Sequence, residues 1–279
     1  MEKTVGLGEL VKGVKQLISL PDIYYKIETM IENGQFSNRE FGKIISQDPA
    51  LTVRLLKIVN SALFNFGGRI DTVSRAVTLV GHNELKMLVV ATTTAKLFKK
   101  FPTKLIDEVQ LWRYSLLTGI ICRILARECH ILHPERLFIA GLLHDIGHLV
   151  IFSKLPQQSQ QIIQLSAQQQ VNSRQIEQEL LGFDYTDVNF QLARDWHFPE
   201  SLQIALKCHH APEQAIEFQL ESSIVHIAKA IALLEHDENA LEQVNPFAWT
   251  ASGLQTDIVE QVQIDAGVQF VEAMEIIFP

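Results

Sequence analysis

The amino-acid sequence predicts an all-α fold, and three observations support that prediction. Apolar residues recur at spacings of three and four along most of the chain, which is the period of an amphipathic helix. No stretch shows the strict alternation of apolar and polar residues that is typical of a half-buried strand. Apolar residues make up 47% and charged residues 20% of the 279 residues, so the chain can bury a core.

The N-terminal hundred residues predict short helices with recognisable end signals. Ser37 and Glu40 have the spacing of a capping box, in which each side chain accepts from the backbone N–H of the other residue. Asp48-Pro49 combines an acidic N-cap with proline at the first helical position, and Gly81 is suited to end a helix. We therefore expect helices over 20–33, 37–45, 48–59, 73–81 and 85–98.

Beyond Phe101-Pro102 the expected helices are longer, and we place a subdomain boundary there. This divides the chain into an N-terminal helical subdomain, residues 1–102, and a larger helical subdomain, residues 103–279. Pro246 and Gly253 indicate a loop over 245–255. The helices expected in the second subdomain are 106–129, 134–152, 157–170, 173–181, 186–196, 201–209, 213–235 and 257–277.

Composition excludes several classes of protein. The 24 basic and 32 acidic residues give a net charge of −8, and no basic run provides the footprint of a nucleic-acid-binding protein. No uncharged apolar stretch reaches the length of a membrane-spanning helix, and residues 1–8 lack the apolar core of a secretory signal. Three cysteines without a C-x-x-C spacing argue against a disulfide framework. We expect a cytoplasmic protein that binds neither nucleic acid nor membrane.

The strongest signal for chemistry is the pair His144-Asp145, which lies in an apolar stretch between Gly141 and Gly147. A buried imidazole and carboxylate are costly unless they are paired, hydrogen-bonded or bound to a metal. Nitrogen and carboxylate ligands together suit Mn, Fe, Zn or Mg. Two such residues alone are more often a buried pair that orders the core, so this interpretation stands beside the metal site.

A second cluster is His209-His210, which ends a predicted helix. Paired histidines could complete a metal shell, or they could form a polar helix terminus that complements the helix dipole. His226 lies on an apolar helix. A lone histidine in that setting is more typical of a hydrogen-bonded core residue than of a metal ligand.

The most specific pattern is the segment 45–62, which follows the spacing I-x-x-D-P-x-L-x-x-x-L-L-x-x-x-N-S. With the His-Asp pair and the paired histidines after it in the same order, the chain resembles the HDOD family, the HD-related output domain of bacterial signalling proteins. The resemblance covers about 17–232. It implies an N-terminal helical bundle packed on an HD-like helical core, related to that of HD phosphohydrolases.

The resemblance also implies a metal site that can be compared position by position. HD superfamily enzymes hold divalent metals with histidines and aspartates, and they hydrolyse phosphate esters with a metal-activated water. Four positions retain the implied ligands: His144, Asp145, His209 and His210. The positions that depart from the superfamily pattern are Tyr114, His148, Tyr185 and Lys229.

The departures weaken the implied metal site. Two phenols and an ammonium replace two imidazoles and a carboxylate. Like unit charges about 4 Å apart repel by about 4 kcal/mol at an effective dielectric near 20. We expect Lys229 to pair with Asp145 instead. No glycine-tyrosine-proline signature follows His209-His210, which argues against a cyclic-di-GMP phosphodiesterase.

The sequence therefore favours a non-catalytic signal-transduction module that acts by binding a ligand or a signalling protein in trans. The alternative is a metal-dependent phosphohydrolase that keeps only the four retained ligands, with Asp145 as the catalytic candidate and Mn, Fe, Zn or Mg as the cofactor. A third interpretation is a ligand sensor in which Tyr114, Tyr185 and Lys229 contact an anion. A homodimer is compatible with the sequence, although no residue pattern indicates one.

Overall fold

All regular secondary structure is helical in the part of the chain that the computed structural model describes, which comprises residues 6–15, 22–34, 36–62, 64, 68–98, 105 and 107–277. This confirms the predicted all-α fold. The predicted subdomain boundary at Phe101-Pro102 lies outside the described residues, as does Pro21 at the expected start of the first helix.

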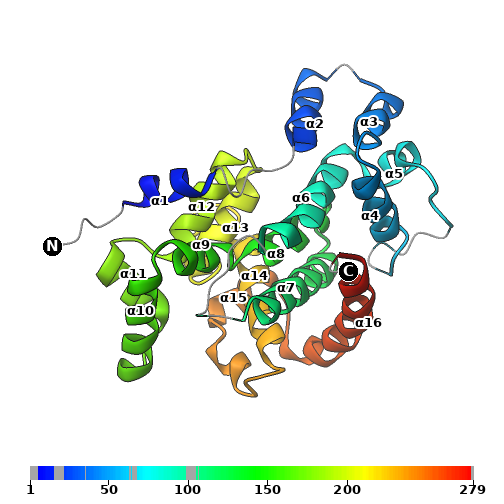
Figure 1. Cartoon of the computed structure of the whole chain (residues 1–279). Helices are drawn as coiled ribbons and strands as arrows, with labels where there is room; N and C mark the ends of the chain where they lie inside the picture. The colour runs from blue at the N-terminus through cyan, green and yellow to red at the C-terminus, as the bar shows by residue number, and fades with distance from the viewer. Residues whose placement is uncertain are drawn as a thin grey trace.

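The N-terminal helices form a bundle around α6 (Figure 1). Helices α2, α4 and α5 pack against α6, and α3 lies against α2 and α5. The preceding α1 instead contacts α12 of the larger helical part. The helices are α1 (Leu7–Lys15), α2 (Asp22–Asn33), α3 (Asn38–Ile45), α4 (Pro49–Val59), α5 (Val73–Val80) and α6 (His82–Phe98).

The predicted end signals are present in this bundle. Ser37 Oγ accepts from Glu40 N–H at 3.3 Å, and Glu40 Oε2 accepts from Ser37 N–H at 2.8 Å. The Asp48 carboxylate accepts from Leu51 N–H at 2.9 Å at the start of α4. These capping bonds satisfy backbone donors that a helix leaves unpaired in its first turn.

The larger part is built around α7, which packs against α8, α14 and α16. Helix α12 packs against α9 and α13, and α16 also contacts α4 of the N-terminal bundle. The elements are α7 (Glu108–Glu128), α8 (Glu135–Leu143), α9 (Ile146–Lys154), α10 (Pro156–Gln169), α11 (Ser173–Leu181), α12 (Tyr185–Asp195), α13 (Glu200–Cys208), η1 (Pro212–Gln214), α14 (Gln219–Leu233), η2 (Ala240–Gln243), α15 (Pro246–Ser252), η3 (Thr256–Ile258) and α16 (Val259–Ile277).

Several predicted elements were wrong in their limits. The predicted helix 134–152 is two helices, α8 and α9. The predicted helix 213–235 starts only at Gln219, because Phe218 adopts a left-handed backbone conformation. The predicted loop 245–255 contains α15, in which Asn245 is the N-cap and Pro246 the first helical residue.

One described stretch, Glu135–Lys154, has the length and apolar composition of a membrane-spanning helix. However, 83% of its most apolar window is buried inside the fold, and the stretch is divided between α8 and α9. Core helices of folded proteins meet the same criterion, so this stretch is weak evidence for a membrane span.

Candidate functional site

The turn between α8 and α9 forms the centre of the site, because it places His144 and Asp145 side by side. Asn189 on α12 donates to the backbone carbonyl of His144 at 2.5 Å and accepts from Gly147 N–H at 2.7 Å. A Cβ atom at position 147 would collide with the backbone carbonyl of Tyr185. Glycine therefore allows α9 to approach α12 closely enough for this clamp.

His144 is fully buried and presents a bare ring nitrogen to Asp145. Its Nδ1 donates to the carbonyl of Gly141 at 2.6 Å, which leaves Nε2 without a proton, 3.5 Å from Asp145 Oδ2. Burial lowers the pKa of His144. Burial opposes ionisation of Asp145, but the positive charges of Lys229 and His148 outweigh it and hold the pKa of the carboxyl well below its usual range.

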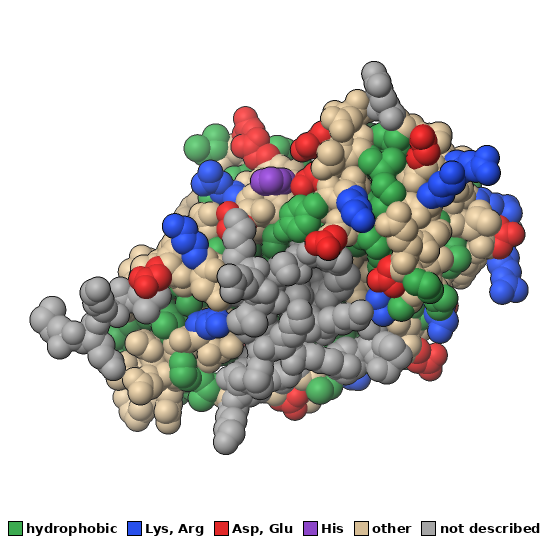
Figure 2. All heavy atoms as spheres, turned by 45° about the horizontal axis from the view of Figure 1, so that its top comes forward, with side chains coloured by type: hydrophobic (Ala, Val, Ile, Leu, Met, Phe, Trp, Pro, Cys, Tyr) green, Lys and Arg blue, Asp and Glu red, His purple; other side chains and the backbone are tan. Residues whose placement is uncertain are grey.

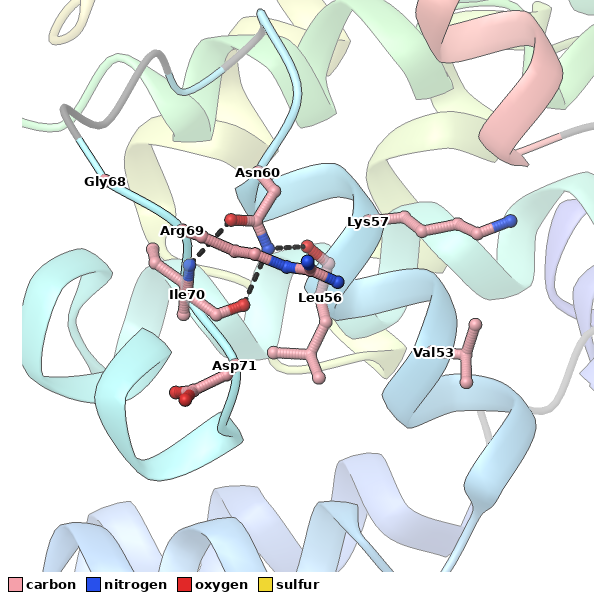
Figure 3. A pocket seen from close by; sticks show the side chains of 8 residues that line it. All are labelled: Val53, Leu56, Lys57, Asn60, Gly68, Arg69, Ile70 and Asp71. Carbon is pink, nitrogen blue, oxygen red and sulfur yellow. Dashed lines mark hydrogen bonds between the residues drawn. The ribbon is translucent and has the colours of Figure 1, made fainter.

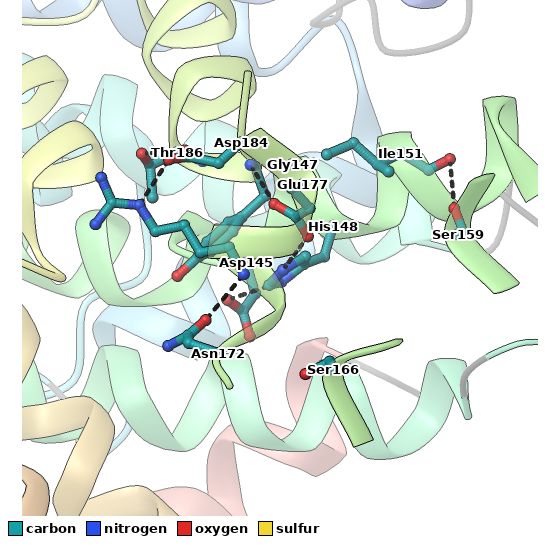
Figure 4. A network of polar contacts seen from close by, with 12 residues as sticks. Asp145, Gly147, His148, Ile151, Ser159, Ser166, Asn172, Glu177, Asp184 and Thr186 are labelled. Atoms are coloured by element: carbon teal, nitrogen blue, oxygen red, sulfur yellow. Dashed lines mark hydrogen bonds and ion pairs between the residues drawn. The ribbon is translucent and has the colours of Figure 1, made fainter. Parts of the chain in front are cut away.

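His148 lies between two carboxylates (Figure 4). Its Nδ1 is 3.4 Å from Asp145 Oδ1 and its Nε2 is 3.1 Å from Glu177 Oε1, while its ring stacks on Tyr185 at 3.7 Å between centroids. Burial disfavours the imidazolium, but the two carboxylates outweigh burial and raise the pKa of His148 to about 9. At neutral pH this side chain is therefore a cation.

A chain of hydrogen bonds joins the paired histidines to Lys229. His209 Nδ1 donates to the carbonyl of Leu206 at 3.1 Å, so its Nε2 accepts from the Tyr185 hydroxyl at 3.0 Å. Lys229 Nζ donates to that hydroxyl at 3.2 Å and to His210 Nε2 at 3.1 Å. Both histidines thus use their Nε2 lone pairs inside the protein.

The two tyrosines fill the interior of the site. Tyr114 packs edge-on against His144, with ring centroids 5.2 Å apart, and its hydroxyl donates to the backbone carbonyl of Lys229 at 3.3 Å. Tyr185 is 0% exposed. Tyr114 is half-buried and lines a pocket of about 280 Å³ that neither Tyr185 nor Lys229 lines, so this pocket does not bring the three groups of the predicted anion sensor together.

Comparison with models of protein families shows the family to which the chain belongs. The HDOD domain family matches residues 17–212, which is more than half of the chain. The chain belongs to the HDOD domain family. The match begins where the sequence predicts and ends before the expected residue 232, so Lys229 and α14 lie beyond the matched HDOD segment.

Solved structures share the fold of this HDOD protein. An HDOD domain protein with unknown function from Geobacter sulfurreducens has a TM-score of 0.76 at 24% identity, covering 97% of this chain and 96% of that one. A protein from Shewanella amazonensis SB2B with the provisional name phosphohydrolase gives 0.73 at 24%, covering 96% and 97%. A protein from Marinobacter aquaeolei VT8, provisionally named a signal transduction protein, gives 0.69 at 21%, covering 96% and 60%. At these identities the likeness shows the fold alone.

The curated relatives are longer proteins. The chain is 26% identical over 240 residues to an uncharacterized protein of Treponema pallidum (strain Nichols), which covers 85% of this chain. The HDOD chain spans 46% of the length of that relative.

We call the cluster of residues at the superfamily positions the HD-like site; it comprises Tyr114, His144, Asp145, His148, Tyr185, His209, His210 and Lys229. These side chains do not fit a divalent metal in this arrangement. His209 and His210 already accept hydrogen bonds, and the ammonium of Lys229 contacts His210. Within the described part of the chain, no group of three or more His, Cys, Asp or Glu side chains could hold a metal ion. His144 Nε2 is a buried acceptor without a hydrogen bond, and it lies 3.5 Å from Asp145 Oδ2.

The HDOD motif segment builds a second feature, an open groove of about 700 Å³ beside α4 (Figure 3). Asn60 Oδ1 accepts from Ile70 N–H at 2.7 Å, and its Nδ2 donates to the carbonyls of Ile70 and Leu56, each at 2.7 Å. Asn60 thereby fastens the loop 68–71 to the end of α4. Lys57 and Arg69 line the groove, as do Val53, Leu56, Asn60, Gly68, Ile70 and Asp71.

Sequence reasoning missed two residues that contact the HD-like site. Glu177 is 0% exposed and Asn189 is 1% exposed, but both lie on helices that resemble polar surface helices in sequence. No local pattern distinguishes them. His226 is hydrogen-bonded at both ring nitrogens, as expected, because Nδ1 donates to the His209 carbonyl at 2.7 Å and Nε2 accepts from Asn245 N–H at 2.9 Å, but it is half-buried and lines a pocket.

Proposed function

We propose that this HDOD protein is a non-catalytic regulatory module of bacterial cytoplasmic signal transduction, which acts by binding. The observation that carries the proposal is the position of Lys229. Its ammonium lies 3.1 Å from His210 Nε2, where the resemblance implies a metal-binding carboxylate. A cationic side chain thus takes part of the place that a divalent ion would need.

Electrostatics support this proposal. Two charges of the same sign about 4 Å apart repel by about 4 kcal/mol at an effective dielectric near 20, and a divalent ion doubles that value. Protonated His148 adds a second positive charge beside Asp145. A metal would have to displace both cations and also break the hydrogen bond between Tyr185 and His209.

The groove beside α4 supports binding of a signalling protein in trans. Between residues 36 and 81 the sequence has six Lys or Arg and three Asp or Glu, whereas the whole chain has 24 and 32. Figure 2 shows Lys and Arg side chains gathered on the side of the molecule where α3 to α5 lie. A surface of this charge is complementary to an acidic segment of a partner protein.

A specific observation favours the second candidate, a metal-dependent phosphohydrolase. His144 Nε2 is a buried acceptor without a hydrogen bond, and it faces the Asp145 carboxylate at 3.5 Å. Two such acceptors suit a cation. In that case Asp145 would be the residue on which turnover depends.

Metal analysis and an activity assay distinguish the two candidates. We expect protein purified without chelator to contain far less than one equivalent of Mn, Fe, Zn or Mg and to leave p-nitrophenyl phosphate intact. Lys229→Asp, which supplies the carboxylate of the superfamily pattern, should gain metal binding in calorimetric titrations with Mn²⁺. Lys154→Asp, at an exposed position at the end of α9, is the matched control and should gain none. Stoichiometric metal in the wild type, with turnover lost in Asp145→Ala, would overturn the proposal.

A further inference from the structure

A pocket of about 240 Å³ opens on the outer side of Lys229. Neither Tyr114 nor Tyr185 lines it, although Lys229 donates to the Tyr185 hydroxyl. Its wall is formed by α14, η2, the turn that follows α13 and the residue that caps α11. The lining residues are Asn172, His210, His226, Lys229, Ala230, Leu233, Ala240, Gln243 and Val244.

Three hydrogen-bond donors of this pocket have no acceptor in the described structure. The Lys229 ammonium has three N–H groups and uses two of them, on Tyr185 and His210. His210 accepts at Nε2, so its Nδ1 carries the proton, and this proton has no acceptor. Asn172 accepts from Arg174 N–H through its Oδ1, which leaves its Nδ2 amide unused.

The carboxylates near Lys229 do not line the pocket. Asp145, Glu177 and Asp184 are at most 7% exposed, and their charges are directed to His148 and Arg174. No Asp or Glu lines the pocket. The pocket is therefore lined by a cationic group and two neutral donors, while the rest of its wall combines aliphatic side chains with the polar His226 and Gln243.

We propose that this pocket binds a small organic oxyanion, with its carboxylate or phosphate on Lys229, His210 and Asn172 and its short apolar group against Ala230, Leu233 and Val244. Charge-assisted hydrogen bonds of this kind are stronger than neutral ones. The inference names a ligand class for the binding function proposed above and rests on it. Lys229 thus serves as an anion-binding group on a scaffold whose superfamily uses metals.

Titrations with butyrate and butyl phosphate test the inference. We expect saturable binding of at least one of them, detected by calorimetry and by shifts of the Asn172 side-chain amide in NMR spectra, and no binding of butanol. Lys229→Met should weaken the affinity about tenfold or more, the factor that corresponds to one charge-assisted bond. Lys207→Met, at a partly buried lysine of α13 that does not line the pocket, should bind like the wild type.

A second variant separates loss of the site from loss of the fold. Ala230→Leu narrows the pocket and leaves Lys229 in place, so it should abolish binding while the far-UV circular dichroism spectrum stays that of the folded wild type. The absence of binding by both probes would overturn the inference, as would equal affinities of wild type and Lys229→Met. If the protein also lacks metal and turnover in those experiments, only this inference fails. If metal and turnover are found, the proposed function itself fails.

Discussion

Two asparagines hold the HD-like site and the groove beside α4 in comparable ways, but in different surroundings. Asn189 joins the backbone of His144 to that of Gly147 inside the protein, where its side chain is 1% exposed. Asn60 joins α4 to Ile70 at the exposed surface. The first clamp supports a closed network of bonded side chains. The second leaves a groove whose charged wall faces solvent.

The difference in burial predicts that substitutions cost different amounts of stability in the two regions. Inside the HD-like site water cannot replace a lost partner, so an unpaired polar atom keeps its full desolvation cost. Along the groove, Asn60 and the charged side chains are exposed, so solvent can replace more of the hydrogen bonds that a substitution removes. The same chemical change should therefore be costly in one region and mild in the other.

The largest expected contrast is between two glycines. Gly147→Ala places a methyl group against the carbonyl of Tyr185, where backbone must move, so we expect a loss of about 3 kcal/mol or more in the free energy of unfolding. Gly68→Ala, in the wall of the groove, meets no atom within 4 Å and should change it by less than about 0.5 kcal/mol. Urea denaturation measures both. Similar losses for the two variants would contradict the comparison.

The second expected effect is a pH dependence that belongs to the closed site. The pKa of His148 rises from 6.5 to about 9, since Asp145 and Glu177 outweigh burial. The protonated form is the stabilised one. Its contribution is therefore complete below pH 6.5 and is lost as the pH rises through 9, with a total on the order of 3 kcal/mol.

Denaturation of wild type and His148→Gln at pH 6 and pH 9.5 measures this contribution. Wild type should lose more stability than the variant over this range. His236→Gln, at an exposed position, should retain the wild-type dependence. A variant as pH-dependent as the wild type would show that His148 is not the group responsible.

The smallest expected effect compares the two clamps themselves. Asn189→Ala leaves the buried Gly147 N–H without a partner and should cost about 2 kcal/mol. Asn60→Ala releases backbone groups of Ile70 and Leu56 at a part-buried position next to the groove, and it should cost less, about 1 kcal/mol. Hydrogen exchange adds a local measure, because the amide of Ile70 should lose protection only in Asn60→Ala. A larger loss of stability in Asn60→Ala would refute the role assigned to burial.

Local signals predicted much of the fold, and their failures have a physical pattern. Asp48-Pro49 correctly predicts the start of α4, whereas Pro246 and Gly253 predict a loop where Asn245-Pro246, a signal of the same kind, starts α15. The break at His144-Asp145 carries no local signal, because it depends on Asn189, which is 45 residues away in sequence. Where helix propensity does not determine the residue at which a helix ends, tertiary contacts of this kind do.

The residue types of the candidate site were predicted from the sequence. The hydrogen-bond partners that come from other helices were not. His144, Asp145, His209 and His210 do lie in one cluster, with ring centroids of His144 and His209 5.7 Å apart. Whether that cluster holds a metal stays a prediction. Lys229 was expected to pair with Asp145, but its hydrogen bonds go to Tyr185 and His210.

Helix α14 lies outside the segment 17–212 that matches the HDOD family, although it packs against α7, α8 and α13. Its buried residues include Ile224, Ile227 and Ile231. A chain cut at residue 212 would expose this seam of the core and would also lack Lys229. The end of the sequence match is therefore not the end of the packed core, and we expect a fragment that ends at residue 212 to be less stable than one that extends through α14.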